Sequence, residues 1–178
     1  MSKVITFSTQ FPSYHPKKGH PTYFVEKFLK SNGITYNECV HEHSGHSFWS
    51  LNIDKEEIVD DFIKFNFSDP FDYEAKNHTI RAGKRFKAGM YFSPRIWSGR
   101  PYFSKTITIA PDTLIVKTYD FEIKEGGYIF IDNKMVQSWD YDIIAKNDGL
   151  SQDDLMAWFK YPKPFSGQII IWNKDLKY

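Results

Sequence analysis

This sequence has a single cysteine and no long apolar run, and one stretch of it has no acidic residues. The single cysteine, Cys39, excludes an internal disulfide bond, so we expect a reducing compartment. The first residues lack the apolar segment of a secretory signal, and no apolar run is long enough to cross a membrane. We therefore expect a cytoplasmic protein without a membrane-spanning segment.

Acidic residues are absent from Lys76–Lys105, which holds eight basic residues and is called the basic block below. The rest of the chain has 15 basic and 22 acidic residues, so the near-neutral total hides a strong asymmetry. Aromatic residues alternate with the cations of the block. Because cations bind phosphate and aromatic rings stack on bases, the block indicates a groove for a nucleotide or a single strand. A basic sheet edge with its aromatic residues in the core would have the same composition.

The length of 178 residues is typical of one domain with a substantial core, and we expect a single domain over residues 1–178. Aromatic residues make up 18% of the chain, which excludes disorder as its general state and favours a β-rich fold. Many short strands with helices at the ends predict an α+β, barrel-like domain.

Hydrophobic periodicity and turn residues predict the individual elements. The expected helices are Thr22–Asn32, capped by Thr22, then Asp54–Phe65, Asp140–Lys146 and one capped by Ser151. The expected strands are Val4–Ser8, His78–Arg81, Tyr91–Trp97, Lys105–Ala110, Leu114–Ile123, Tyr128–Ile131, Lys134–Val136 and Gln168–Trp172.

A cluster of cysteine and histidine lies at Cys39, His41, His43 and His46. Thiolate and imidazole are good zinc ligands, but the paired spacing typical of zinc sites is absent. The alternation of His41 and His43 fits one face of a strand equally well. We expect no metal ion and no other cofactor.

An acidic segment, residues 54–74, carries eight acidic residues and two lysines. The ordinary interpretation is a solvated helix face with favourable negative charge at the helix start. The alternative is a surface for a protein partner.

Five motifs, taken in their order along the chain, resemble a known family. An opening ITF strand is followed by a helix, and the later motifs are K-x-x-T-I-R at Lys76–Arg81, FKAG after it, NDGLS before a helix, and G-Q-x-I at Gly167–Ile170. This order is similar to the ASCH domain of the PUA-like superfamily. YHPKKGHPTYFVEKFL and FSPRIWSGRPYFSK resemble a phage and bacterial branch of it. The likeness covers most of residues 3–173, and residues 34–75 look like an insertion that is partly helical.

The resemblance implies a small mixed β-barrel flanked by helices, with a cleft for RNA, DNA or modified nucleosides. One bacterial branch is an amidohydrolase that removes the acetyl group from N4-acetylcytidine with a lysine, a threonine and a glutamate. The motif match puts Lys76 at the lysine position, Thr79 at the threonine position and Asp148 at the glutamate position. Aspartate is one methylene shorter than glutamate.

The same three residues make chemical sense as an acyl-transfer site. A threonine hydroxyl needs a base to take its proton, and lysine becomes one where a buried, cationic setting lowers its pKa. Asp148 can hold the lysine or pass a proton to a leaving amine. Residues three apart on a regular strand face opposite sides, so Lys76 must precede the strand or lie on a bulge if both residues serve one site.

Three functions remain open at this point. The first is binding of RNA, DNA or a modified nucleoside, the second is an amidohydrolase that uses Lys76, Thr79 and Asp148, and the third is a protein-interaction module that uses residues 54–74. The candidate ligand-binding residues are Arg81, Lys84, Arg85, Arg95, Trp97, Arg100 and Tyr102.

Overall fold

The computed structural model describes residues 2–34, 36–40, 47–51 and 72–178. The predicted helix Asp54–Phe65, the histidines His41, His43 and His46, and most of the acidic segment and the 34–75 insertion lie outside these residues. The α+β class is confirmed, since the described part contains both helices and antiparallel sheets.

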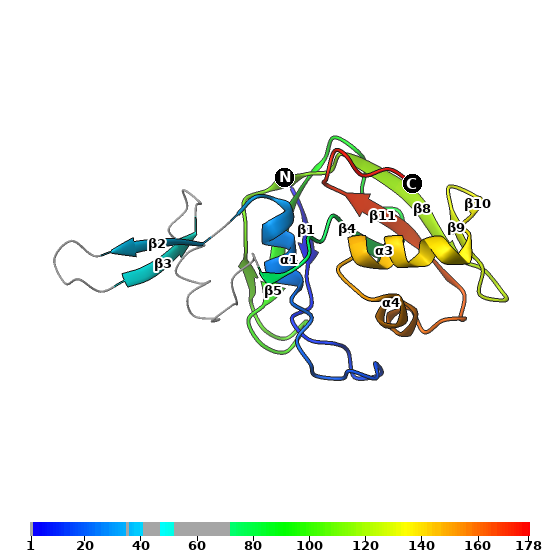
Figure 1. The fold of residues 1–178 in the computed structure, drawn as a ribbon, viewed down its shortest axis with the longest axis horizontal. Helices are drawn as coiled ribbons and strands as arrows, with labels where there is room; N and C mark the ends of the chain where they lie inside the picture. The colour runs from blue at the N-terminus through cyan, green and yellow to red at the C-terminus, as the bar shows by residue number, and fades with distance from the viewer. Residues whose placement is uncertain (1, 35, 41–46, 52–71) are drawn as a thin grey trace.

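A five-stranded antiparallel sheet, in the order β10-β9-β8-β11-β4, forms the larger half of the fold (Figure 1). Its internal strand β11 pairs with β8 on one side and with β4 on the other, and its residues Gly167–Ile171 are buried. The strands of this sheet are β4 (His78–Ala82), β8 (Lys117–Ile123), β9 (Ile129–Ile131), β10 (Lys134–Met135) and β11 (Phe165–Ile171).

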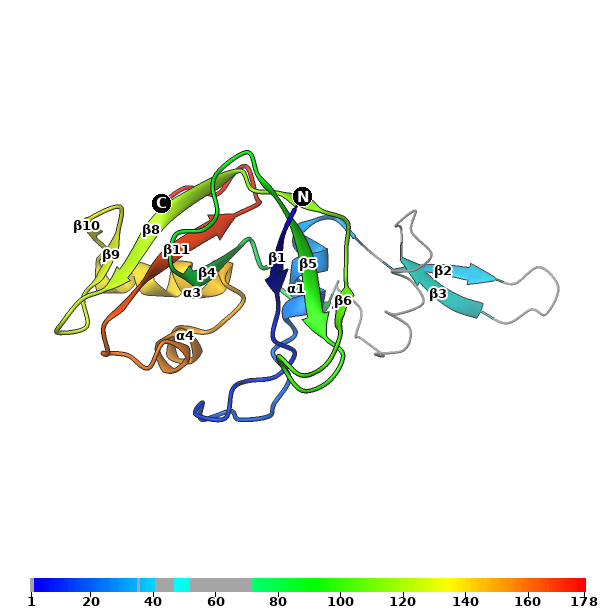
Figure 2. The ribbon, with the colours of Figure 1, turned by 180° about the vertical axis from the view of Figure 1, so that it is seen from behind.

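A smaller sheet has β5 at its centre, paired with β1 in parallel and with β6 and β7 in antiparallel fashion (Figure 2). Phe92 and Ile96 of β5 are fully buried, as expected for a strand with neighbours on both sides. These strands are β1 (Lys3–Thr6), β5 (Tyr91–Trp97), β6 (Thr106–Thr108) and β7 (Thr113–Leu114).

A separate pair of strands lies in the insertion, where β2 (Tyr36–Val40) and β3 (Ser47–Leu51) are antiparallel. Figure 1 shows this pair apart from the two larger sheets.

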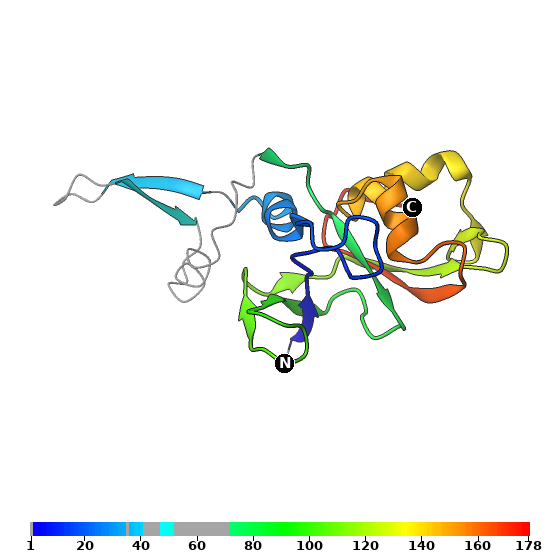
Figure 3. The ribbon, with the colours of Figure 1, turned by 90° about the horizontal axis from the view of Figure 1, so that it is seen from below.

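Helix α1 (Phe24–Ser31) joins the two sheets through an apolar stripe of Phe24, Val25, Phe28 and Leu29, all of which are buried. The ring of Phe28 lies 6.1 Å from that of Phe92 on β5 and 5.2 Å from that of Trp172, which follows β11. Helices α3 (Tyr141–Asn147) and α4 (Gln152–Trp158) cover the five-stranded sheet (Figures 1 and 3), preceded by the short 3-10 helix η2 (Ser138–Asp140). In the described part of the chain, none of the helices has the length and apolarity needed to span a membrane.

The predicted helix caps agree with the structure at one helix and differ at another. Ser151 caps α4, because its side chain accepts a hydrogen bond from the Asp154 N–H. At α1 the cap position is Tyr23, with φ of 56°, and its side chain makes no capping bond. Thr22, the predicted cap, still accepts the N–H of Phe24, the first helix residue, at 3.4 Å. It also donates its hydroxyl to the Ser8 carbonyl at 2.5 Å, which ties the helix start to the chain after β1.

The closed barrel is not seen, since the described strands form open sheets. On one side the chain passes from one sheet into the other. Strand β7 pairs with β5, β8 pairs with β11, and between β7 and β8 the Val116 N–H donates to the Ile171 carbonyl at 2.8 Å. The predicted strand Leu114–Ile123 is therefore divided between the sheets. On the other side β1 and β4 are both edge strands, with a side chain rather than a backbone ladder between them. The fold is open there.

Candidate functional site

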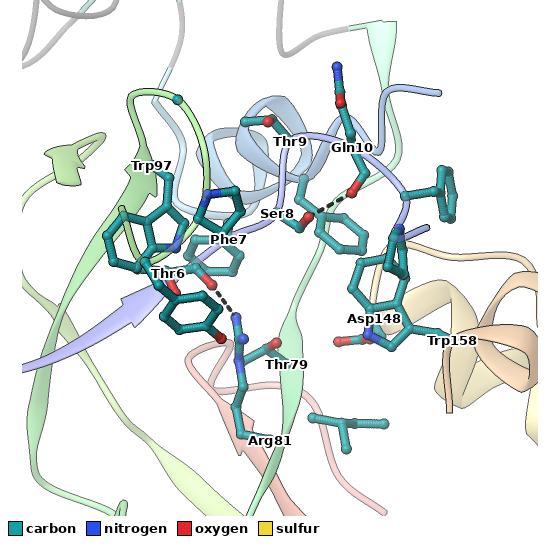
Figure 4. Close-up of a pocket in the computed structure, with 17 residues that line it drawn as sticks. Thr6, Phe7, Ser8, Thr9, Gln10, Thr79, Arg81, Trp97, Asp148 and Trp158 are labelled. Atoms are coloured by element: carbon teal, nitrogen blue, oxygen red, sulfur yellow. Dashed lines mark hydrogen bonds between the residues drawn. The ribbon is translucent and has the colours of Figure 1, made fainter. Parts of the chain in front are cut away.

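A pocket of about 430 Å³ occupies the opening between β1 and β4 (Figure 4). Its walls come from the end of β1 and residues 7–12, from β4, from residues 97–102, and from the region of α3 and α4. Polar and aromatic side chains that line the pocket include Thr79, Arg81, Trp97, Tyr102, Asp148 and Trp158.

Lys76 lies just before β4, which begins at His78, as the three-residue spacing to Thr79 required. Its N–H donates to the Lys27 carbonyl of α1 at 2.9 Å, which fixes its backbone. The side chain is 1% exposed, and its amino group lies 4.3 Å from the centre of the Phe24 ring. Nζ donates to Asp148 Oδ1 at 2.7 Å and also to the Asp148 main-chain carbonyl. Lys76 is therefore held behind Asp148, and Asp148 lines the pocket.

The NDGLS motif explains how Asp148 reaches this place. Asp148 ends α3, and Gly149 follows with φ of 77°, a conformation that favours glycine. A Cβ at Gly149 would lie 3.2 Å from the Lys27 side chain and 3.4 Å from Cβ of Lys76, so the turn packs closely on both lysines. Leu150 is buried and Ser151 starts α4.

Burial moves the pKa values of both members of this ion pair toward neutral pH. It lowers the pKa of Lys76 to about 8, although Asp148 acts in the opposite direction. It raises the pKa of Asp148, although Lys76, Arg81 and a hydrogen bond from the Ile80 N–H favour the carboxylate. Moving a proton between the two groups therefore costs less than it would in water.

Thr79 and Arg81 alternate on β4 and both line the pocket. Arg81 donates from Nη2 to the Thr6 carbonyl at 2.6 Å and so bridges the two strand edges (Figure 4). Its Nε is buried and has no hydrogen-bond partner among the described residues. Thr79 is buried between Arg81 and Asp148 in this view.

The aromatic wall is formed by Trp97 and Tyr102, with ring centres 5.4 Å apart. Tyr102 is 86% exposed, so its ring lies at the rim of the pocket.

The remaining four predicted ligand-binding residues do not line the pocket. Lys84 forms an exposed ion pair with Asp120 at 2.5 Å. Arg95 donates to the hydroxyls of Ser93 and Thr106, and Arg100 lies over the Phe103 ring, 4.4 Å from its centre. Arg85 is exposed. The pocket therefore contains Arg81, Trp97 and Tyr102 of the predicted set, together with Thr79 and Asp148.

Sequence reasoning missed two residues behind the pocket. His78 is fully buried, with Nε2 3.8 Å from Asp148 Oδ1. Its Nδ1 lies 2.8 Å from the hydroxyl of Tyr178. The position of His78 inside K-x-x-T was a usable signal, whereas Tyr178 carried none because it lies 100 residues away.

Metal-ligating residues do not gather in the part of the chain that the structure describes, where no group of three or more His, Cys, Asp and Glu side chains is placed to hold an ion. The side chains of Cys39, His41, His43 and His46 lie outside that part.

Comparison of the chain with models of known protein families, with curated proteins and with solved structures found no match.

Proposed function

We propose that the pocket between β1 and β4 binds a nucleoside, either free or unstacked from RNA or DNA, as in the PUA-like ASCH domains that the sequence resembles. The observation that carries this proposal is that buried polar groups and the aromatic rings of Trp97 and Tyr102 line one pocket. The volume of about 430 Å³ is within the range of small-molecule sites.

The polar groups suit the hydrogen-bonding edge of a base. The Asp148 carboxylate accepts hydrogen bonds, and the unpartnered Nε–H of Arg81 is a donor within the described residues. Thr79 lines the same pocket, and its hydroxyl can donate or accept. A pyrimidine presents neighbouring donors and acceptors on one edge, so it can satisfy all three groups together.

The aromatic groups suit the face of the base. Trp97 and Tyr102 are tilted at 51° to each other, and both line the pocket. A ring that enters the pocket can stack on either of them, which contributes about 1–3 kcal/mol per base in other proteins.

Calorimetric titration with cytidine, uridine, N4-acetylcytidine and short single strands of RNA and DNA tests the proposal. We expect wild type to bind at least one of them, and Trp97→Ala to weaken that binding about 5-fold to 100-fold. Asp148→Asn keeps the size of the side chain and is expected to change the preference among bases. Binding of the single strands is expected to weaken with salt.

The matched control is Lys84→Ala, which removes a cation of the basic block outside the pocket. It is expected to leave nucleoside binding unchanged. Absence of binding to every probe by folded wild type, or equal losses in Lys84→Ala and Trp97→Ala, contradicts the proposal.

A second candidate function, amide hydrolysis on an N4-acylated cytidine, is favoured by one observation. Lys76 and Asp148 form a buried pair in which the pKa of Lys76 is lowered to about 8, and Thr79 lines the same pocket as Asp148.

In this candidate the Thr79 hydroxyl attacks the acetyl carbon and its proton passes to Asp148. Asp148, rather than Lys76, takes this role because it is the member of the pair that lines the pocket. The C–N bond then breaks, the amine leaves with the proton from Asp148, and the acetyl group stays on Thr79. Water hydrolyses this ester and releases acetate, which restores the threonine hydroxyl.

Mass detection of cytidine formed from N4-acetylcytidine tests this candidate. We expect turnover by wild type and by Lys84→Ala, and a loss of at least 100-fold in Thr79→Val, which keeps the shape of threonine without its hydroxyl. Turnover that persists in Thr79→Val contradicts the assignment. Binding without turnover leaves the first proposal in place and removes the second.

A further inference from the structure

We propose that Tyr178 and His78 form a positioning relay behind the pocket, in which Tyr178 fixes the protonated nitrogen of His78 and aims it at the Asp148 carboxylate. The relay deepens the proposed function, on which its effect on ligand rests. Its existence can be measured separately from any ligand.

The geometry places three groups in a row. His78 is the first residue of β4 and is fully buried. One ring nitrogen, Nδ1, lies 2.8 Å from the Tyr178 hydroxyl, and the other, Nε2, faces Asp148 Oδ1 at 3.8 Å. That distance is too long for a hydrogen bond, and Nε2 has no other partner among the described residues. A buried polar nitrogen without a partner requires an explanation.

The direction of the protons follows from the neighbouring asparagines. Asn173 donates to the Asn77 side chain, and Asn77 donates to the Asn147 side-chain oxygen, each at 2.9 Å. The Asn147 amide donates to the Ile143 carbonyl at 2.9 Å, and its neighbourhood to Tyr178 favours the phenolate, which partly offsets the burial that raises the pKa of Tyr178. The Tyr178 hydroxyl proton can then point at His78 Nδ1.

One neutral form of the histidine then suits both of its neighbours. Burial, reinforced by Lys76, lowers the pKa of His78 well below its ordinary value, so the ring is neutral and carries one proton. Since Nδ1 accepts from Tyr178, that proton is on Nε2, the nitrogen that faces Asp148. The opposite form would place a lone pair against the carboxylate.

The relay points the positive end of the His78 Nε2–H bond at the Asp148 carboxylate, on the side away from the pocket. The titratable and charged groups that face this carboxylate are Lys76, His78 and Arg81, with Tyr178 one contact further back. Removing the Tyr178 hydroxyl frees the imidazole to exchange tautomers, which makes the ionised carboxylate less favourable. The ring of Tyr178 packs beside His78, with centres 5.5 Å apart, and remains in Tyr178→Phe.

Nitrogen-15 NMR of the imidazole tests the relay without a ligand. In wild type we expect His78 to be protonated at Nε2 and bare at Nδ1 at neutral pH. In Tyr178→Phe we expect a mixture of both tautomers, and the Asp148 carboxyl, followed by carbon-13 NMR, to titrate at higher pH. The control is Tyr128→Phe, an exposed tyrosine, which is expected to match wild type.

A second experiment measures how binding depends on pH, with whichever nucleoside wild type binds. As pH falls, we expect Tyr178→Phe to lose affinity for the nucleoside about one pH unit above the pH at which wild type loses it. At a given acidic pH this is about a tenfold lower affinity. Wild-type His78 protonated at Nδ1, or an unchanged tautomer and carboxyl titration in Tyr178→Phe, overturns the relay. The expected NMR result without any nucleoside binding by wild type overturns the proposed function and leaves the relay standing.

Discussion

At the scale of single residues, the buried pair of Lys76 and Asp148 dominates. Both side chains are buried, so each charge is stabilised by the opposite charge of its partner. Removing one partner of such a pair typically costs about 3–5 kcal/mol, because the other charge stays buried alone. We expect Lys76→Met to lose a free energy of unfolding of this size in urea denaturation. The double variant Lys76→Met/Asp148→Asn removes both charges and is expected to lose less. Equal losses in the two variants would contradict a mutual dependence.

The same pair has a signature in the pH dependence of stability. The pKa of Lys76 is lowered to about 8 in the folded protein from an ordinary value of 10.5, so between these values the folded protein binds fewer protons than the unfolded chain. Stability relative to the double variant is therefore expected to rise as pH increases from about 8 to 10.5, and to be lost as pH falls back. Urea titrations across this window measure the effect.

At the scale of elements, the position of β4 depends on its contact with β11. Gly167 pairs with Ala82, and a Cβ at this glycine would collide with the Arg81 backbone carbonyl. Gly167→Ala is therefore expected to push β4 away from β11, with a loss of several kcal/mol of stability and faster amide exchange along β4. Gly99→Ala is the control, since a Cβ there meets only ordinary contacts near 3.5 Å. Normal exchange along β4 in Gly167→Ala would show that the backbone adjusts cheaply.

Most elements were predictable from local pattern, while their pairings were not. The Asp132-Asn133 turn has the positive φ values that its residues favour, and the apolar stripe of α1 is buried as predicted. The division of Leu114–Ile123 was missed because an apolar alternation does not say which neighbour a strand pairs with. Lys84 pairs with Asp120 and Tyr178 with His78, contacts that depend on strand register and on a distant segment.

For the site, motif order grouped Lys76, Thr79 and Asp148; in the structure Lys76 binds Asp148, and Thr79 lines the same pocket as Asp148. The positions of the basic side chains could not be predicted, because net charge in a stretch does not reveal which faces the side chains take. Four of the seven predicted ligand residues lie away from the pocket, and only three-dimensional register separates them from Arg81, Trp97 and Tyr102.

At the scale of the whole molecule, residues 113–117 carry the chain from the smaller sheet into the larger one, whereas β1 and β4 are joined through a side chain, by the Arg81 bond to Thr6. The pocket lies between β1 and β4, so its width depends on the angle between the two sheets. Residues 113–117 do not line the pocket, yet we expect substitutions there to change its width through that angle.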